Sequence, residues 1–485
     1  MIPFLRNIDI VIIALSSYLI FFSRFLHSGL DLYFFYSDDF FYYLKIAENI
    51  SANGFSSFNG IVETNGYHPL WQLVLVVLLK IFPSDSIFII IAIIQSFSAI
   101  LSYILLKTIF SKFLSDNINI MSSSLIFLII VLMTKSGMET IITIPLMILA
   151  IYFLFNKKDK VFLLSIVLTL MILSRLDSVV FAGLIYLFLF INSKFSLKII
   201  PKIFIGTLPL FLYLLYNYIS YDHLMPVSGA AKQLKETWIP AWYPIQGIFE
   251  LYPGKIIFAL IPTIMLAMNI FFMLIKRSKN QLLQFAFVLF PVVLLLFYCF
   301  RSGWNLWSWY YYMLIPSSIV FFINFDFLFK RFSSILKYAA LFGVFSWIFL
   351  NAYTKKPIKD SKYQSMVRMI EFMKDKKGVL AMGDAAGLPG YVLDQPIIQL
   401  EGLVMDFDYL EMVKKGDLEE IFKKYKVDYY ITISSTKDGE NWIFTEPWDH
   451  HPYIINTNMN TKKEPIYSGG DNWLDFRIWD LREVR

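Results

Sequence analysis

The sequence predicts a polytopic α-helical membrane protein that carries a soluble α/β domain at its C-terminus. Of its 485 residues, 57% are hydrophobic and only 16% are charged, whereas soluble proteins contain about 45–50% apolar and about 25% charged residues. Apolar runs such as 86–106, 256–275 and 281–300 approach or exceed the roughly 20 residues that span a bilayer. A segment in lipid must satisfy its own backbone hydrogen bonds, so we interpret these runs as helices.

Twelve apolar segments are predicted as helices. The first is interpreted as a retained helix, because it lacks a small-residue cleavage site and further apolar segments follow it. The segments lie near 8–27, 69–83, 86–107, 118–134, 138–156, 160–174, 177–192, 198–219, 255–276, 281–300, 309–326 and 335–353.

Basic loops orient this bundle, since Lys and Arg concentrate on the cytoplasmic side of membrane proteins. The loops near 156–160, 194–202, 276–279 and 330–331 are basic and are expected inside, in the plasma (inner) membrane. With a cytoplasmic N-terminus, the loop after the first segment, the 220–254 loop and the C-terminal domain are then expected outside.

The number of crossings is constrained by this orientation. Loop 28–68 and Glu139 are both expected outside, so an even number of crossings must separate them, yet three segments lie between them. One of 69–83, 86–107 and 118–134 therefore does not cross, and the first has only about 15 residues, below the usual minimum of about 17. We expect about 11 transmembrane helices.

Residues 1–354 are predicted as a transmembrane catalytic domain and residues 355–485 as a soluble extracytoplasmic α/β domain. The second part is rich in Lys, Asp and Glu and contains no spanning run. Its clearest elements are an amphipathic helix over 366–374, a strand over 379–382, a helix near 416–425 and a strand over 427–433.

Composition argues against several classes of function. The net charge of +6 is modest and reflects cytoplasmic Lys and Arg, so no nucleic-acid partner is expected. The single cysteine, Cys299, excludes an internal disulfide and argues against a cysteine-based metal site. The loop Gly383-Asp384-Ala385-Ala386-Gly387 lacks the Gly-x-Gly-x-x-Gly spacing, so we predict no nucleotide-binding loop there.

Asp38 and Asp39 follow the first apolar segment, in the loop that is expected outside. A carboxylate there can act as a general base on an acceptor hydroxyl, and two adjacent like charges raise one pKa, which suits a base. The pair is also suitable for a divalent cation or a sugar hydroxyl. The alternative is structural: Ser37 or Asp38 would cap a helix over 40–50.

A polar and aromatic cluster, Asn65-Gly66-Tyr67-His68-Pro69-Leu70-Trp71, precedes the next apolar run. Asn65, Tyr67 and His68 can hydrogen-bond a sugar or a phosphate, and Tyr67 or Trp71 can stack on a sugar ring. An interfacial aromatic belt with a proline-initiated helix explains the aromatic residues and the proline. It does not explain Asn65 and His68.

Five further charged residues lie near segment ends. Glu139 begins an apolar helix, either as a functional group or as a charge that stabilises the helix N-terminus. Arg175 and Asp177 form either a turn or a phosphate-binding arginine beside an acceptor. Lys232 suits an anionic ligand or a solvated loop, and Arg301, among Trp and Tyr residues, suits interfacial anchoring or a lipid-phosphate contact.

Together these motifs resemble the GT-C superfamily of membrane glycosyltransferases, most closely its arabinofuranosyltransferase-like and protein-mannosyltransferase-like branches. The resemblance extends over roughly residues 8–330. It rests on Asp38-Asp39 with Phe41-Tyr42-Tyr43, the cluster 65–71, Gly137-Met138-Glu139-Thr140 and Arg175-Leu176-Asp177.

This resemblance implies an enzyme that transfers a sugar from a polyprenyl-phosphate donor to a glycan, lipid or protein acceptor on the outer face of the membrane, usually with inversion. Asp38 matches the first acid of the family motif and would be the general base, with Asp39 beside it. Glu139 matches an acid of a second loop. We assign Arg175 and Lys232 to the donor phosphate from their charge and predicted side. No resident cofactor or metal is predicted, although Asp38 and Asp39 could hold a divalent cation.

A membrane transporter or lipid-linked-sugar flippase is the alternative function. It would predict inverted repeats, broken helices at mid-membrane and ionisable residues deep in the bilayer. The sequence shows no such pattern, because its acids cluster near predicted helix ends. Glycosyl transfer is therefore the expected function.

Overall fold

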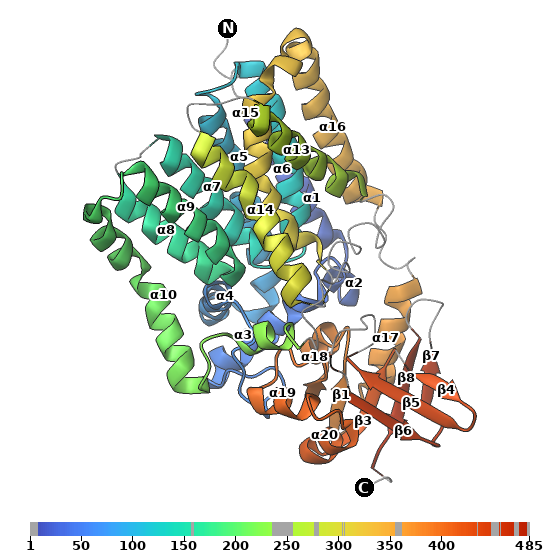
Figure 1. Cartoon of the computed structure of the whole chain (residues 1–485). Helices are drawn as coiled ribbons and strands as arrows, with labels where there is room; N and C mark the ends of the chain where they lie inside the picture. The colour runs from blue at the N-terminus through green and yellow to red at the C-terminus, as the bar shows by residue number, and fades with distance from the viewer. Residues whose placement is uncertain are drawn as a thin grey trace.

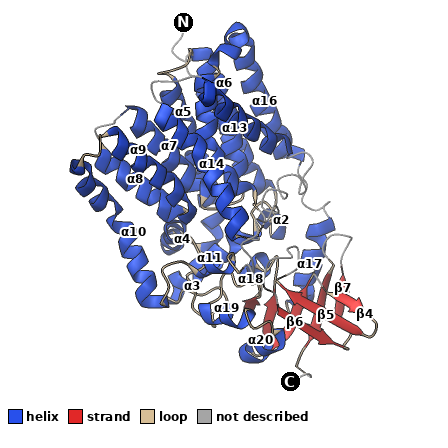
Figure 2. Cartoon of the chain, in the orientation of Figure 1, coloured by secondary structure: helices blue, strands red, loops and turns tan. Residues whose placement is uncertain are grey.

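The structure is a computed structural model that describes residues 8–156, 160–234, 256–275, 281–302, 304, 306–354, 361–433, 435–447, 455, 457–469 and 475–482. A bundle of helices contains the first two thirds of the chain, and a mixed α/β region, residues 361–482, lies against one end of it (Figure 1). The described strands all belong to this α/β region (Figure 2). Two of the predicted basic loops, 156–160 and 276–279, and most of the 220–254 loop lie outside the described residues.

A helix lies in each of the twelve predicted apolar segments. Six helices of the described chain are long and apolar enough to cross a membrane, and five shorter apolar helices accompany them. The helices of this part are α1 (Ile8–Phe22), α2 (Leu30–Tyr33), α3 (Asp38–Asn53), α4 (Pro69–Ile81), α5 (Ile87–Phe110), α6 (Asp116–Thr134), α7 (Thr140–Asn156), α8 (Val161–Ser174), α9 (Val179–Asn192), α10 (Ile200–Tyr221), α11 (Val227–Ala231), α13 (Ile256–Ile275), α14 (Gln281–Arg301), α15 (Ile315–Asn324) and α16 (Ser333–Thr354).

Helix α4 begins and ends at the same end of the bundle. Near its start, the backbone N–H of Leu176 donates to His68 Nδ1, 3.2 Å away. Just after its end, Phe88 at the start of α5 lies 5.2 Å from the ring of Tyr36, beside α3. The 13 residues of α4 measure about 20 Å, less than the roughly 30 Å of a bilayer core. Segment 69–83 is thus the one of the three that does not run from one end of the bundle to the other.

The opposite end of the bundle is held by a buried ion pair. Lys107 Nζ lies 2.6 Å from Asp9 Oδ2, and the hydroxyl of Tyr103 donates to the same oxygen at 2.6 Å. These contacts join the start of α1 to the end of α5. They place the end of α5 away from the α/β region, so the helix spans the length of the bundle.

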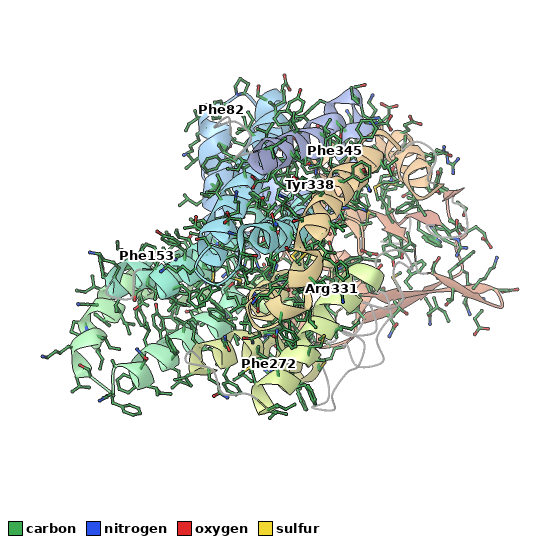
Figure 3. All side chains as sticks on the ribbon, turned by 90° about the horizontal axis from the view of Figure 1, so that it is seen from above. Phe82, Phe153, Phe272, Arg331, Tyr338 and Phe345 are labelled. Carbon is green, nitrogen blue, oxygen red and sulfur yellow. The ribbon has the colours of Figure 1, made fainter. Side chains whose placement is uncertain are left out.

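The outer surface of the bundle is apolar. Large side chains project outward from α16, where Tyr338 is 63% exposed and Phe342 is 73% exposed (Tyr338 is labelled in Figure 3). Helix α10 is exposed along most of its length, with Phe204 and Leu212 among its outward residues. Apolar surface of this extent is typical of helices that face lipid.

The α/β region contains two sheets. The larger has the strand order β2-β1-β3-β8-β7, with β1 parallel to both β2 and β3 and with β8 antiparallel to β3 and β7. The smaller is antiparallel, in the order β4-β5-β6. The elements are α17 (Ser361–Met373), β1 (Val379–Met382), α18 (Gly387–Val392), β2 (Ile397–Gln399), α19 (Phe407–Val413), α20 (Leu418–Tyr425), β3 (Val427–Thr432), β4 (Thr436–Asp438), β5 (Asn441–Glu446), β6 (Thr457–Thr461), β7 (Tyr467–Gly469) and β8 (Phe476–Asp480).

Aromatic packing joins the α/β region to the bundle. The ring of Tyr391, on α18, lies 5.8 Å from Tyr33, 5.4 Å from Phe41 and 6.3 Å from Phe88. A second contact stacks His223 on Phe407 with ring centroids 3.7 Å apart. The two parts therefore share a packed interface at the end of the bundle where α3 begins.

Candidate active site

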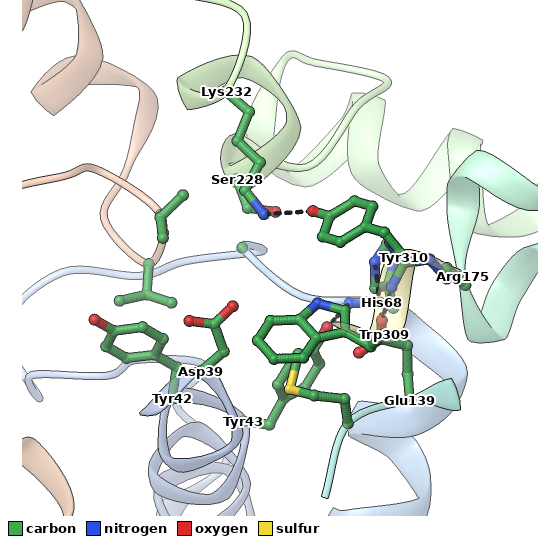
Figure 4. A pocket seen from close by; sticks show the side chains of 14 residues that line it. Asp39, Tyr42, Tyr43, His68, Glu139, Arg175, Ser228, Lys232, Trp309 and Tyr310 are labelled. Atoms are coloured by element: carbon green, nitrogen blue, oxygen red, sulfur yellow. Dashed lines mark hydrogen bonds and ion pairs between the residues drawn. The ribbon is translucent and has the colours of Figure 1, made fainter. Parts of the chain in front are cut away.

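A cavity lies at the junction of the bundle and the α/β region (Figure 4). It encloses about 50 Å³, which is room for a few water molecules and is smaller than the roughly 300–1,000 Å³ of most ligand pockets. Its walls come from α3, the 65–68 segment, α11, the 308–314 segment and the α/β region. The lining residues are Asp39, Tyr42, Tyr43, Gly66, His68, Met138, Glu139, Arg175, Ser228, Lys232, Trp309, Tyr310, Leu403 and Val404.

Of the two adjacent acids, Asp38 and Asp39, it is Asp39 that lines the cavity. It lies in the first turn of α3, and its carboxylate points toward the side of the cavity where Lys232 lies (Figure 4). Burial raises the pKa of Asp39, the charge of Lys232 opposes that shift, and nearby Asp384 adds to it. A raised pKa brings a carboxylate closer to the pH at which a general base works best.

Asp38 does not line the cavity. Its two carboxylate oxygens accept the backbone N–H groups of Gly387 and Leu388, each at 2.8 Å, at the start of α18. Burial raises the pKa of Asp38 to about 7, although both hydrogen bonds act in the opposite direction. The expected helix cap is also absent at Ser37, because its hydroxyl donates to the carbonyl of Ser136, 3.2 Å away.

A buried ion network forms the wall opposite Asp39. Arg175 donates to Glu139 through Nη1 and to Asp177 through Nε, which lies 3.0 Å from Asp177 Oδ1. The guanidinium lies over the rings of Tyr310 and Tyr312, at 4.2 Å and 5.0 Å. Two carboxylates thus offset the charge of Arg175. Glu139 Oε2 is buried and has no hydrogen-bond partner among the residues that the structure describes.

His68 lies between this network and the cavity. Its Nδ1 accepts the backbone N–H of Leu176, so the proton of the neutral ring is on Nε2, which lies 4.0 Å from Glu139 Oε1. Burial lowers the pKa of His68 to about 4, although the charge of Glu139 acts in the opposite direction. The ring is therefore a neutral donor at physiological pH.

Lys232 supplies the second cation of the cavity. Its Nζ donates to the hydroxyl of Tyr310 at 3.1 Å. Burial alone would lower the pKa of Lys232, but Tyr310 and Asp39 together hold the pKa above its usual value. Among the described residues, no carboxylate forms an ion pair with this lysine, in contrast to Arg175, which pairs with Glu139 and Asp177.

Four predicted substrate-binding residues do not line the cavity: Asp177, which pairs with Arg175, and Asn65, Tyr67 and Arg301, which support its walls. Asn65 Oδ1 accepts the backbone N–H of Val227 at 2.9 Å, at the start of α11. Arg301 donates to the side chain of Gln233, next to Lys232, at 3.0 Å. The hydroxyl of Tyr67 lies 2.9 Å from Ser56 Oγ and holds the 56–67 loop.

No sequence motif marks two parts of the site. Leu403 and Val404 follow β2 in the α/β region and reach the cavity only because this region packs on the first loop. Trp309 and Tyr310 belong to the aromatic segment after Arg301, whose composition predicts interfacial anchoring, but both line the cavity. The described residues contain no group of three or more His, Cys, Asp or Glu that could hold a metal ion.

Comparison with known proteins gives one informative result. No family model matches the sequence, and no curated protein matches it. A solved structure does: ArnT from Cupriavidus metallidurans, in a crystal structure bound to undecaprenyl phosphate, aligns with a TM-score of 0.55 and 12% sequence identity. The alignment covers 87% of this chain and 92% of that chain. The likeness shows that this chain shares the fold of that protein: a bundle with several candidate membrane-spanning helices, followed by a C-terminal mixed α/β region.

Proposed function

We propose that this GT-C-like chain is a glycosyltransferase that moves a sugar from a polyprenyl-phosphate donor to an acceptor hydroxyl. The observation that carries the proposal is the cavity itself. It places a half-buried carboxylate, Asp39, opposite two cations, Lys232 and Arg175, at one end of an apolar helical bundle. The fold is shared with ArnT, whose crystal structure holds undecaprenyl phosphate.

Asp39 is assigned as the general base in place of Asp38. Both oxygens of Asp38 already accept backbone N–H groups, whereas Asp39 lines the cavity. In the reaction, the acceptor oxygen forms a bond to the anomeric carbon and its proton passes to Asp39. The bond between that carbon and the phosphate oxygen breaks, and the electron pair leaves with the lipid phosphate.

Lys232 and Arg175 are assigned to the phosphate of the donor. Negative charge increases on the leaving phosphate as the bond breaks, so fixed cations in a site shielded from water lower the barrier. Lys232 is expected to stabilise the charge of the phosphate more than Arg175 does, because Glu139 and Asp177 offset the charge of Arg175. The Tyr310 hydroxyl, which accepts from Lys232, holds the ammonium at the cavity wall.

Glu139 and His68 are assigned to the sugar. Glu139 Oε2 is buried without a partner, and a sugar hydroxyl that donates to it would remove the cost of that unpaired oxygen. His68 Nε2 offers a neutral donor close by. Asp177 acts indirectly, by pairing with Arg175 and holding it in place. Asp177 is itself held by the hydroxyl of Tyr312, which donates to its Oδ1 at 2.8 Å.

The cavity is assigned to the outer face of the plasma (inner) membrane. Asp39, Glu139, Arg175 and Lys232 belong to segments that the alternation of predicted crossings puts on the side opposite the basic loops. These four residues meet at the end of the bundle that carries the α/β region. The acceptor is then a glycan, lipid or protein exposed on that face.

The test supplies purified protein with undecaprenyl phosphates that carry a radiolabelled hexose or pentose, together with an envelope extract as acceptor. Transfer of label to the extract by the parent, and its loss in Asp39→Asn, supports the assignment. Label that crosses the bilayer of a proteoliposome while it stays on the lipid would instead identify a flippase and contradict the proposal.

A further inference from the structure

Asp38 connects the catalytic loop to the α/β region through two hydrogen bonds. Its carboxylate accepts from the backbone N–H groups of Gly387 and Leu388, both at 2.8 Å. Gly387 closes the loop 383–387, which lacks the spacing of a nucleotide loop. The last residue of this loop, Gly387, instead donates its backbone N–H to the carboxylate of Asp38.

Two glycines, Gly387 and Gly66, allow the backbones of the bundle and of the α/β region to pack closely beside the cavity. A Cβ at Gly387 would lie 2.2 Å from the carbonyl oxygen of Asp38, and a Cβ at Gly66 would lie 2.0 Å from the carbonyl oxygen of Leu403. Real Cβ atoms do not approach oxygen so closely, so neither glycine tolerates a side chain without movement. Leu403 and Val404 line the cavity next to Gly66 and His68 as a result.

The contribution of Asp38 concerns position more than stability. Burial raises the pKa of Asp38 to about 7, so the ionised carboxylate gains no net stability from docking relative to water. The aromatic contacts of Tyr391 provide apolar packing at the same interface. Paired hydrogen bonds to two consecutive amides fix the orientation in which this packing occurs.

We propose that Asp38 is a positioning residue that holds the α/β region over the cavity, so that Leu403 and Val404 exclude water from the space where Asp39 meets the acceptor. The inference rests on the proposed function and deepens it. Asp38 then acts through Gly387 and Leu388 and touches neither substrate. The adjacent acids of the first loop have separate roles, one in docking and one in proton transfer.

Loss of this docking has a chemical signature. Water that enters the cavity can replace the acceptor: its oxygen bonds to the anomeric carbon, its proton passes to Asp39, and the lipid phosphate leaves with the electron pair. The products are free sugar and lipid phosphate. A misplacement of about 1 Å can cost a transfer reaction on the order of 100-fold, whereas water needs no such alignment.

The experiment measures transfer and hydrolysis of the same labelled undecaprenyl-phosphate sugar by Asp38→Asn and Gly387→Ala. The first variant removes the charge from the contact, and the second pushes α18 away while all carboxylates remain. We expect the ratio of transfer to hydrolysis to fall at least about 10-fold in both, with hydrolysis retained. Asp39→Asn should lose both reactions together, and Lys423→Ala, on the exposed face of α20, is the matched control.

A second readout does not depend on the chemistry. Amide hydrogen exchange at Gly387 and Leu388 should accelerate in Asp38→Asn, because the asparagine carries no charge and keeps only one acceptor oxygen for the two N–H groups. Unchanged exchange overturns the proposal, whether or not the protein transfers sugar. A parent that turns over no lipid-linked sugar contradicts the proposed function alone and leaves the exchange result to decide the docking role.

Two kinetic results would also overturn the proposal. If the ratio of transfer to hydrolysis in Asp38→Asn equals that of the parent, the contact of Asp38 with Gly387 and Leu388 does not govern access of water. Loss of both reactions in Asp38→Asn, with a parental ratio in Gly387→Ala, would place Asp38 in the chemistry as the base.

Discussion

At the scale of single residues, the two adjacent acids of the first loop differ in their surroundings. Successive residues of a helix point about 100° apart, so Asp38 and Asp39, in the first turn of α3, cannot face the same group. Asp38 faces α18 and Asp39 faces the cavity. The sequence predicts that an acid of this pair is functional, but only the packing of the α/β region determines which one is available.

The ionisation of Asp39 gives a first prediction. Because burial raises the pKa of Asp39 and Lys232 opposes that rise, activity should increase with pH as the carboxylate loses its proton. Lys232→Gln removes the opposing charge, so the acidic limb of the pH–kcat profile should move to higher pH. The profile is measured on the labelled donor from pH 4 to 9.

Lys423→Gln, a neutralisation on exposed α20, should leave the profile in place. A limb that moves equally in both variants, or that does not move in Lys232→Gln, would show that Asp39 is not the group whose ionisation limits the reaction.

Glu446 gives a second prediction, on stability. The hydroxyl of Tyr430 donates to its Oε1 at 2.8 Å, and its Oε2 is buried without a partner. Burial raises the pKa of Glu446 from 4.5 to about 8. The folded state therefore keeps a proton that the unfolded state releases between these values, and stability falls as pH rises through that window.

Glu446→Gln removes this titration and keeps an oxygen acceptor for Tyr430. The thermal unfolding temperature of the purified protein should fall between pH 5 and pH 8.5 by less in the variant than in the parent. Glu440→Gln removes an exposed carboxylate beside the same strand and is the control. Equal losses in all three proteins would mean that Glu446 is ionised in the folded state.

At the scale of elements, apolar runs predict the helices and the central strands well. The strands over 379–382 and 427–432 match their predictions closely because they are buried on both faces and contain few polar residues. The composition of the tail from Asn441, aromatic and rich in turn-forming residues, predicts no strand, but the tail contains β5, β6, β7 and β8. In β5 the buried Trp442 and Phe444 alternate with less buried residues, a short pattern that the surrounding polar residues obscure.

Helix α4 gives a third prediction, on topology. Both of its ends lie at the end of the bundle that carries the cavity, so we predict that α4 does not cross the membrane. Single cysteines at Glu63 and Asp85, which are exposed before and after α4, should react with a membrane-impermeant maleimide from the same side of intact cells. The native Cys299 is buried and should not interfere.

The control for α4 is Asp116→Cys, at the start of α6 and at the opposite end of the bundle. It should react only after the membrane is permeabilised. Reaction of Glu63→Cys and Asp85→Cys from opposite sides would mean that α4 crosses the bilayer and that one of the other two segments does not.

At the scale of the whole molecule, the site belongs to the interface between two parts of the chain. The charged residues that sequence motifs single out, such as Asp39, Glu139 and Arg175, come from the bundle. The wall formed by Leu403 and Val404 comes from the α/β region, about 360 residues later than Asp39. No local pattern marks these two residues, because their role depends on how the α/β region docks and not on their own chemistry.

Docking gives the last prediction. Tyr391 packs its ring against Tyr33, Phe41 and Phe88, and its neighbour Gly390 lies against Phe58, where a Cβ would be 2.2 Å from the ring. Tyr391→Ala should weaken the interface by about 2–3 kcal/mol, the range for truncation of an incompletely buried aromatic side chain. Because α18 also presents the amides that hold Asp38, limited proteolysis should cleave the α/β region faster in the variant, and transfer should fall more than hydrolysis. Tyr391→Phe keeps the ring contacts and should behave as the parent in both measurements. If Tyr391→Ala matches Tyr391→Phe, the α/β region is held by other contacts, such as the stack of His223 on Phe407, and its position over Asp39 does not depend on α18.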